Sequence, residues 1–251
     1  MMLSRDARHL ALPQVGANGQ QRIGDSTALL IGAGGIGCAA ATYLVSSGVG
    51  HVLICDFDTV DVTNLGRQVL YGPADIGSLK AEIAAARLSV LNPDIRISAI
   101  AKRLDDDALS KAVAEVDVVL DGCDNFATRF QVNDACVAAG RRLISGAAIR
   151  MEGQLAVFGP DYDASPCYRC LYAEADESLE NCAGNGVLAP VPGVIGTMMA
   201  VEALKYLAGG IAGDIAGDAR LQLYDAATME FRSLNINKRK GCRTCASNRE
   251  K

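Results

Sequence analysis

Apolar residues along the first 150 positions alternate between two kinds of segment. Short apolar runs, typical of buried strands, are separated by longer stretches in which apolar positions have helical spacing. The predicted strands are 27–31, 51–55, 95–100, 117–122 and 142–147, and the predicted helices are 36–48, 78–93, 105–116 and 127–140. Such alternation predicts βαβ units, whose parallel strands need helices on both faces of the sheet. We therefore expect an α/β fold with a doubly wound, mostly parallel sheet.

The pattern changes after residue 150. The segment 152–158 has the pattern of a strand, 159–189 is irregular and polar, 192–210 has helical spacing, and 221–236 predicts a β-hairpin. We accordingly separate residues 1–150, which include an N-terminal helical segment, from residues 151–251. Both parts are expected to belong to one continuous domain.

Two of the predicted helices have an apolar side that is visible in the sequence. These sides consist of Leu79, Ile83, Ala86 and Val90 in the first helix, and of Val194, Met198, Val201 and Leu204 in the second.

The first predicted strand ends in a glycine loop. Gly32, Gly34 and Gly37 have the spacing G-x-G-x-x-G between an apolar strand and an alanine-rich helix, the context in which this motif binds nucleotide phosphates. Asp56 ends the second strand, where a carboxylate can bind ribose hydroxyls. The loop therefore predicts a Rossmann-like nucleotide site for any ribose-bearing nucleotide, NAD included. A tight turn without a ligand is the alternative interpretation.

Charged and amide side chains follow Asp56. The run DFDTVDVTNLGRQ contains Asn64, Arg67 and Gln68, and Lys80 follows on the next helix. Cations beside a phosphate-binding loop suit phosphoryl or nucleotidyl transfer, whose transition state concentrates negative charge, whereas hydride transfer needs no such cluster. Alone, Arg67 and Lys80 would be interpreted as ordinary surface charges.

A second acidic segment, VVLDGCDNFATR, follows a predicted buried strand. It places Asp121 and Asp124 at the edge of the sheet where open α/β folds bind ligands. A carboxylate there can hold Mg²⁺ against phosphate oxygens. Alternatively, Asp124 or Asn125 caps the following helix, and the two roles are compatible.

Composition narrows the class of protein. The chain has 251 residues, half of them hydrophobic, and a formal net charge of −5, which provides no global basic field for nucleic acid. No apolar run approaches the roughly 20 residues of a membrane span, and the N-terminus lacks a secretory signal pattern. We expect a cytoplasmic protein with neither a nucleic-acid nor a membrane partner, and with reduced cysteines.

Four of the nine cysteines form two C-x-x-C pairs: Cys167 with Cys170, and Cys242 with Cys245. Two such pairs among reduced thiols predict a closed, structural zinc site that ties the C-terminus to the irregular middle segment. A redox C-x-x-C is the main alternative, but that motif normally opens a helix, which neither pair is predicted to do. The cysteines on predicted core elements are interpreted as packing residues: Cys38, Cys55, Cys123 and Cys136.

The ordered motifs resemble the MoeB/ThiF family, bacterial relatives of the ubiquitin-activating enzymes, over nearly the whole chain. They are GAGGIG, DFDTVDVTNLGRQ, VLDGCDNFATR, SGAAIRMEGQL, CYRC, GVLAPVPGVIGTMMAVEALK and GCRTC. The resemblance, nearer to MoeB, implies ATP-dependent adenylation of the C-terminal glycine of a ubiquitin-like sulfur carrier protein, MoaD- or ThiS-like and ending in Gly-Gly. Pyrophosphate is released, and the activated carbonyl becomes a thiocarboxylate in molybdopterin or thiamine biosynthesis. Because a carboxylate nucleophile is already ionised, the presence of only two histidines is no obstacle.

The resemblance also implies roles for particular residues. Residues 1–150 would bind ATP and catalyse adenylation, and residues 151–251 would hold zinc and receive the carrier. Asp56 would hold the ribose, and Asp124 would take Mg²⁺. The other residues implied to bind the nucleotide are Gly32, Gly34, Gly35, Gly37, Asn64, Arg67, Gln68, Lys80 and Asn125.

Two further residues complete the implied catalytic set with Arg67, Lys80 and Asp124. Arg8 occupies the place of an arginine that in the family reaches into the neighbouring subunit's site, which implies a homodimer. Cys182 corresponds to a cysteine that bonds the carrier in some members and is dispensable in others, so an inert loop thiol remains its alternative interpretation. No rhodanese segment is present, so we expect a separate protein to donate sulfur.

Three rival functions remain open at this stage. A tRNA-modifying dehydratase of the same superfamily is disfavoured by the paired C-x-x-C motifs and the acidic balance. An NAD-dependent oxidoreductase would leave Arg67, Lys80 and Asp124 without a purpose, and a zinc-containing binding module without catalysis would not need them either. The motifs leave the carrier and its pathway open between molybdopterin, thiamine and a specialised metabolite.

Overall fold

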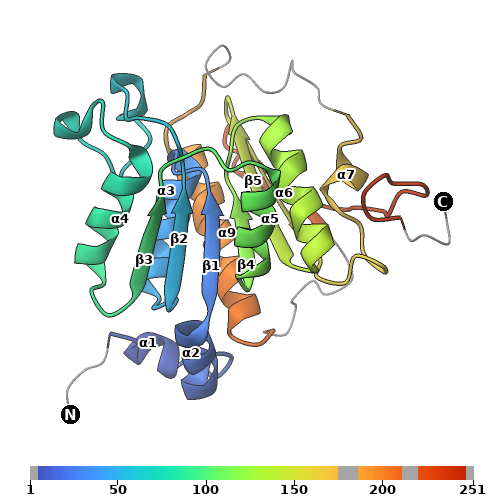
Figure 1. The fold of residues 1–251 in the computed structure, drawn as a ribbon, viewed down its shortest axis with the longest axis horizontal. Coiled ribbons are helices and arrows are strands. Elements are labelled where there is room, and N and C mark those ends of the chain that lie inside the picture. The colour runs from blue at the N-terminus through green and yellow to red at the C-terminus, as the bar shows by residue number, and fades with distance from the viewer. Residues whose placement is uncertain (1–4, 175–185, 211–219, 247–251) are drawn as a thin grey trace.

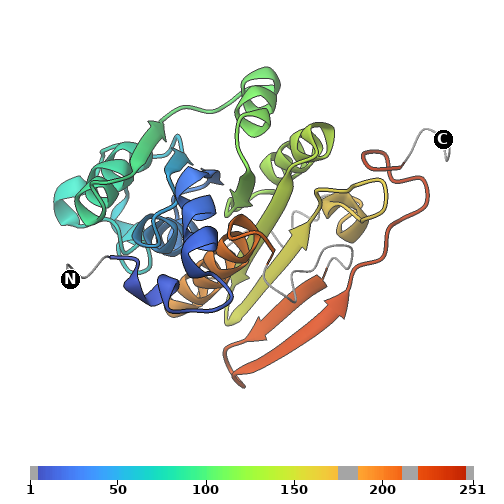
Figure 2. The ribbon, with the colours of Figure 1, turned by 90° about the horizontal axis from the view of Figure 1, so that it is seen from below.

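The computed structural model describes residues 5–174, 186–210 and 220–246, and its centre is a single twisted sheet (Figures 1 and 2). Eight strands are described, in the order β3-β2-β1-β4-β5-β6-β7-β8. They are β1 (Thr27–Ile31), β2 (His51–Cys55), β3 (Arg96–Ile100), β4 (Val118–Asp121), β5 (Arg142–Ile149), β6 (Glu152–Phe158), β7 (Arg220–Asp225) and β8 (Glu230–Asn235). Strands β1 to β5 pair in parallel, and β6, β7 and β8 pair antiparallel. The predicted doubly wound, mostly parallel α/β sheet is confirmed.

Helices cover both faces of this sheet. They are α1 (Ala7–Leu10), α2 (Gly16–Asp25), α3 (Gly35–Ser46), α4 (Lys80–Leu91), α5 (Asp106–Ala114), α6 (Phe126–Ala139), α7 (Tyr168–Leu171) and α9 (Pro190–Leu207). One core cluster joins α3, α4 and α9 to one face, and the other joins α5, α6 and α7 to the opposite face. Neighbouring residues Leu29 and Leu30 of β1 belong to different clusters because strand side chains alternate between faces. Burial on both faces explains why the parallel strands are continuously apolar.

Two helices bury residues other than those on the apolar sides visible in the sequence. In α4, Ala84 and Leu88 are buried while Val90 is 84% exposed. In α9, Ile195 and Met199 are buried while Val201 is half-exposed. Alanines bring α4 close to the sheet, and α9 is apolar around most of its circumference, so its sequence does not mark the side that faces the core.

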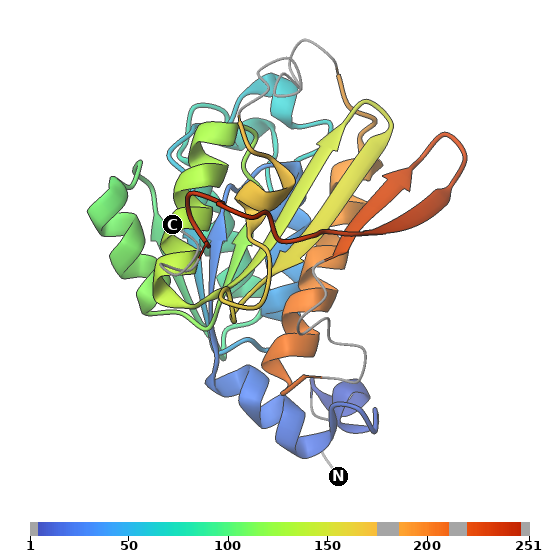
Figure 3. The ribbon, with the colours of Figure 1, turned by 90° about the vertical axis from the view of Figure 1, so that its right-hand side faces the viewer.

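The C-terminal part extends the sheet formed by the N-terminal part. Strand β6 pairs with β5, and the hairpin of β7 and β8 continues outward to the sheet edge. After β8 the chain returns past α7, which brings two segments distant in sequence together (Figure 3). None of the helices in the described ranges is long and apolar enough to cross a membrane.

Candidate functional site

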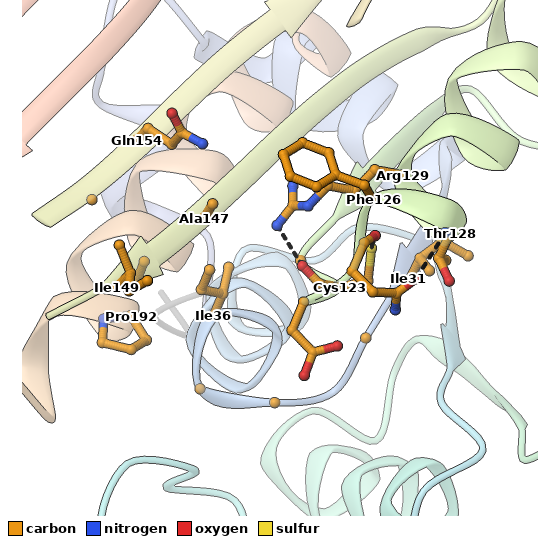
Figure 4. A pocket seen from close by; sticks show the side chains of 18 of the residues that line it. Ile31, Ile36, Cys123, Phe126, Thr128, Arg129, Ala147, Ile149, Gln154 and Pro192 are labelled. Atoms are coloured by element: carbon orange, nitrogen blue, oxygen red, sulfur yellow. Dashed lines mark hydrogen bonds between the residues drawn. The ribbon is translucent and has the colours of Figure 1, made fainter. Parts of the chain in front are cut away.

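The candidate site is a cavity of about 570 Å³ at the carboxyl ends of the parallel strands (Figure 4). It lies where the strand order reverses between β1 and β4, so the loops that follow these two strands diverge above the sheet. This is the position at which open α/β sheets bind ligands. The topology therefore brings the glycine loop, the loop after Asp56 and the loop after β4 to one place.

The glycine loop requires glycine at two points. Gly32 has φ +89°, and a Cβ there would lie 3.0 Å from the carbonyl carbon and oxygen of Gly122. A Cβ on Gly37 would lie 1.9 Å from the carbonyl oxygen of Gly32. Gly34 and Gly35 line the cavity, and α3 begins at Gly35, so the unpaired N–H groups of its first turn face an anion placed there.

We expect Gly37→Ala to destabilise the fold by about 3 kcal/mol, because its methyl group overlaps the Gly32 carbonyl. Thermal unfolding should show a fall of about 10 °C. Gly66→Ala is the matched control: a Cβ at Gly66 has nothing within 4 Å, so its unfolding temperature should remain that of the unaltered protein. Equal unfolding temperatures for the two variants would contradict this account of the loop.

Asp56 is fixed by backbone donors at the end of β2. Its Oδ2 accepts the Ala33 N–H at 2.7 Å, and its Oδ1 accepts the Asp58 N–H at 2.8 Å. Burial raises the pKa of Asp56, while these two N–H groups and Lys80 oppose the rise. Each oxygen retains a free lone pair, so the carboxylate can accept hydroxyl donors from a ribose.

Two cations and one amide line the cavity beside it. Lys80 is buried, and its Nζ lies 3.1 Å from Oδ2 of the half-exposed Asp58. The Arg67 Nη1 donates to the Thr63 carbonyl oxygen at 2.8 Å. Gln68 is 4% exposed, and its Oε1 has no partner in the described part of the chain. A buried acceptor without a partner at the cavity wall fits a donor group on a ligand.

Asn64 is placed differently from the other predicted nucleotide contacts. It does not line the cavity, and its Oδ1 accepts the Asp61 N–H at 3.1 Å in a capping box. In this structure its amide therefore shapes the loop that carries Arg67.

The loop between β4 and α6 separates two predicted roles. Asp124 is exposed, lines the cavity and has no hydrogen bond or ion pair within the described residues. Asn125 is the N-cap of α6, since its Oδ1 accepts the Thr128 N–H at 2.9 Å. Cys38, Cys55 and Cys136 are buried as predicted. Cys123 is half-buried: it packs against the core cluster as predicted and also lines the cavity.

Sequence reasoning missed several residues around the cavity. Arg103 stacks over Phe57, with its Cζ 4.4 Å from the ring centroid, and both line the cavity. Arg129 is buried at the cavity wall and points at the loop that carries Cys123 (Figure 4). Asp121, expected among possible ligands, has no exposed surface and belongs to the Arg129 network. Only burial distinguishes Arg129 and Asp121 from surface charges.

The cavity continues from the glycine loop across the sheet. Ala147 and Ile149 of β5 and Gln154 of β6 form its next stretch (Figure 4). The Tyr172 hydroxyl donates to Gln154 Oε1 at 2.8 Å. Beyond them the lining reaches β7 and β8 with Leu223, Tyr224, Asp225, Glu230 and Arg232. This cavity lining, called the groove below, thus links the glycine loop to the hairpin at the sheet edge.

The four paired cysteines converge in space. Their Sγ atoms all lie within 4.8 Å of one another, with Cys167 to Cys242 at 3.7 Å and Cys170 to Cys245 at 3.4 Å. A zinc ion bound tetrahedrally at about 2.3 Å separates its sulfurs by about 3.8 Å, so this donor set fits zinc. Burial raises the pKa of the Cys245 thiol to about 12, which a bound cation would reverse by stabilising thiolates.

One argument against the redox alternative was wrong. Cys167 is the N-cap of the short helix α7, so the first C-x-x-C pair does open a helix. The redox alternative is instead weakened by the second pair, which places two more thiols beside the first.

Two predicted catalytic residues lie away from the cavity or outside the description. Arg8 is exposed on α1, which lies with α2 at the opposite end of the strands (Figure 1). It therefore does not reach the cavity of its own chain. Cys182 lies outside the described residues.

The chain is similar to known proteins over nearly its whole length. The model of the ThiF family matches residues 7–244. The molybdopterin-synthase adenylyltransferase of Escherichia coli (strain K12) is 45% identical over 238 residues, which span 95% of this chain and 94% of that protein. The sulfur carrier protein ThiS adenylyltransferase of the same organism is 43% identical over 241 residues, or 96% of this chain and 94% of that protein.

A solved structure shares the fold. The chain superimposes on E. coli MccB, in its structure with succinimide, with a TM-score of 0.82 at 24% identity, over 98% of this chain and 75% of that one. At this identity the likeness supports the fold and not the substrate.

Proposed function

The chain belongs to the ThiF family, and on that premise we propose that it adenylates the C-terminal glycine of a ubiquitin-like sulfur carrier protein, using ATP and releasing pyrophosphate. The observation that carries the proposal is the convergence, on one cavity, of the glycine loop, Asp56, Arg67, Lys80 and Asp124. These groups are far apart in the sequence, and a nucleotidyl transfer needs all of them together.

The chemistry requires positioning and charge neutralisation. The carrier's terminal carboxylate attacks the α-phosphorus of ATP, an acyl–phosphate bond forms, and the bond to pyrophosphate breaks. No proton has to be removed from the nucleophile, so no general base is needed. Arg67 and Lys80 neutralise negative charge as it develops on the phosphates, and the partly apolar lining of the cavity strengthens that effect.

The nucleotide is proposed to lie with its phosphates at the glycine loop. Gly32, Gly34, Gly35 and the start of α3 face the phosphates, while Gly37 keeps α3 close to the loop. Asp56 accepts the ribose hydroxyls, and the unpartnered Gln68 Oε1 accepts a further donor from the nucleotide. Asn64 and Asn125 support the site through the loops that they cap.

Asp124 is proposed to hold Mg²⁺. Its carboxylate is exposed to the cavity and free of other partners in the described ranges, and a hard oxygen donor of this kind fits a small divalent cation beside phosphates. The cation would supply further positive charge to the leaving pyrophosphate.

The carrier is proposed to enter along the groove over β5, β6 and the hairpin. Its two terminal glycines carry no side chains, so they could extend along the cavity lining from the hairpin towards the glycine loop. Residues 151–251 would thus receive the carrier while residues 1–150 bind ATP. The nearly equal identities to relatives named for molybdopterin synthase and for ThiS leave the carrier open between MoaD-like and ThiS-like types.

A homodimer is proposed because of the position of Arg8. The residue lies at the amino-terminal edge of the sheet, opposite its own cavity, so a role in adenylation requires the site of a second copy. A separate protein is proposed to supply sulfur. A cytoplasmic location is also proposed, because four thiols grouped as for zinc suit a reducing compartment. Cys182 is retained as the candidate acceptor of the activated carrier.

Carrier-dependent ATP–pyrophosphate exchange tests the function. The purified protein should exchange label in the presence of a MoaD-like or a ThiS-like carrier that ends in Gly-Gly, and not with the same carrier lacking its last glycine. Tight NAD binding without exchange would favour an oxidoreductase, and exchange supported by tRNA instead would favour the dehydratase. Either result would overturn the proposal.

A further inference from the structure

A buried ion pair lies beside the proposed magnesium site. Asp121, the last residue of β4, has no exposed surface, and Arg129 of α6 is 6% exposed. The Arg129 Nη1 lies 3.5 Å from Asp121 Oδ2. Burying two charges costs several kcal/mol per ion unless hydrogen bonds satisfy them, and apolar residues can replace such pairs without loss of stability. The pair is thus better explained by what it holds in place than by stability.

The contacts of Arg129 join three separate parts of the site. Its Nη1 donates to the Ser145 hydroxyl at 2.9 Å, and its Nη2 donates to the Gly146 carbonyl oxygen at 2.9 Å, both on β5. The same Nη2 also donates to the carbonyl oxygen of Cys123, in the loop between β4 and α6 (Figure 4). One guanidinium therefore fixes that loop against β5 from within α6.

Asp121 holds the same loop from the other side. Its Oδ1 accepts the Cys123 N–H at 3.1 Å, and its Oδ2 accepts the Ser145 hydroxyl at 3.2 Å. The peptide groups on both sides of Cys123 are therefore bonded to the buried pair. The next residue is Asp124, whose own side chain has no partner in the described ranges.

We propose that Arg129, anchored by Asp121, is a positioning residue that sets the place of the Asp124 carboxylate for a divalent cation. The inference rests on the proposed function and adds a residue to it. Both Nη atoms of Arg129 are engaged with protein acceptors, so the group acts through the loop and not on the phosphates. A lysine would keep the charge but could not span the three acceptors, because its single ammonium lacks the planar fork of arginine.

Metal affinity tests this role directly. The dissociation constant of Mn²⁺, a magnetic substitute for Mg²⁺, is measured from the paramagnetic resonance of the free ion with a non-hydrolysable ATP analogue and no carrier. We expect Arg129→Lys to weaken Mn²⁺ binding at least fivefold, while the affinity for AMP without metal stays within twofold. Asp124→Asn is the positive control. The matched control is Arg141→Lys, which alters an arginine at the opposite end of β5 that donates to the Ala114 carbonyl oxygen.

Three outcomes decide the matter. Unchanged Mn²⁺ affinity in a folded Arg129→Lys variant overturns the inference, as does an equal loss in Arg141→Lys. If Arg129→Lys shows no cooperative unfolding transition, Ser145→Ala is measured instead, because it removes only the hydroxyl between Asp121 and Arg129. Unchanged Mn²⁺ affinity in Ser145→Ala then overturns the inference. Failure of carrier-dependent exchange in the unaltered protein would instead overturn the proposed function, which the Mn²⁺ measurement does not require.

Discussion

Asp124→Ala is expected to lower the rate of carrier-dependent ATP–pyrophosphate exchange about 10²–10³-fold, the usual cost of removing one group that stabilises transition-state charge. The carboxylate faces the cavity and has no partner among the described residues, so its removal leaves no buried group unsatisfied. Thermal unfolding should therefore stay within about 2 °C of the unaltered protein. Exchange is measured at saturating ATP over a range of Mg²⁺ concentrations.

Glu115→Gln is the matched control for Asp124→Ala. Glu115 is an exposed acid at the C-cap of α5, which precedes the amino end of β4, so the substitution removes a similar charge from the opposite edge of the sheet. It should leave the exchange rate unchanged. Full exchange by Asp124→Ala would assign the cation to another group.

Cys245→Ser is expected to remove bound zinc and to lower the stability of the protein by at least about 4 kcal/mol, as is typical when a structural metal is lost. The unfolding temperature should fall by about 10 °C or more. The cluster joins the segment after β8 to α7. Besides it, hydrogen bonds hold this segment in place: Thr244 donates to Asp134 of α6 at 2.8 Å, and the Arg239 N–H points to Cys170 Sγ at 3.4 Å. Metal analysis and calorimetry of the same preparation check both effects.

Cys38→Ala is the control for the loss of zinc. Cys38 is also buried, but it lies on α3 away from the cluster, so one zinc per chain should remain. Wild-type zinc content in Cys245→Ser, or no zinc in the unaltered protein purified without chelators, would contradict the site. Loss of zinc should also weaken carrier binding, since Tyr168 lies between two of the ligands and lines the cavity.

Much of the fold follows from local patterns in the sequence. The parallel strands are short apolar runs buried on both faces, and glycines and N-caps mark the turns next to them. The sequence therefore predicts where the strands and helices follow one another along the chain. The sequence does not show which sides of α4 and α9 face the core. Ala84 is buried and Val90 is exposed, because the small side chain of alanine allows α4 to approach the sheet closely. The spacing of apolar residues along a helix does not take side-chain size into account.

The site divides in the same way. The sequence is enough to recognise the glycine spacing, Asp56 and each of the two C-x-x-C pairs. Each of these lies within a few residues, so its geometry depends on local backbone conformation. The sequence does not reveal the roles of Arg129 and Asp121, since residue type alone does not distinguish a buried ion pair from two surface charges. Asn64 likewise has the residue type of a ligand but caps a loop, and only the position of Asp61 shows this.

The sequence by itself thus determined the α/β class, the glycine loop, the cysteine pairs and the family, all of which depend on residue type and short-range spacing. Only the tertiary structure decided which charges face one cavity, that the groove runs on to β8, and that Arg129 holds the loop of Asp124. The physical reason is that these features depend on strand order. The reversal between β1 and β4 places loops that are about 90 residues apart side by side.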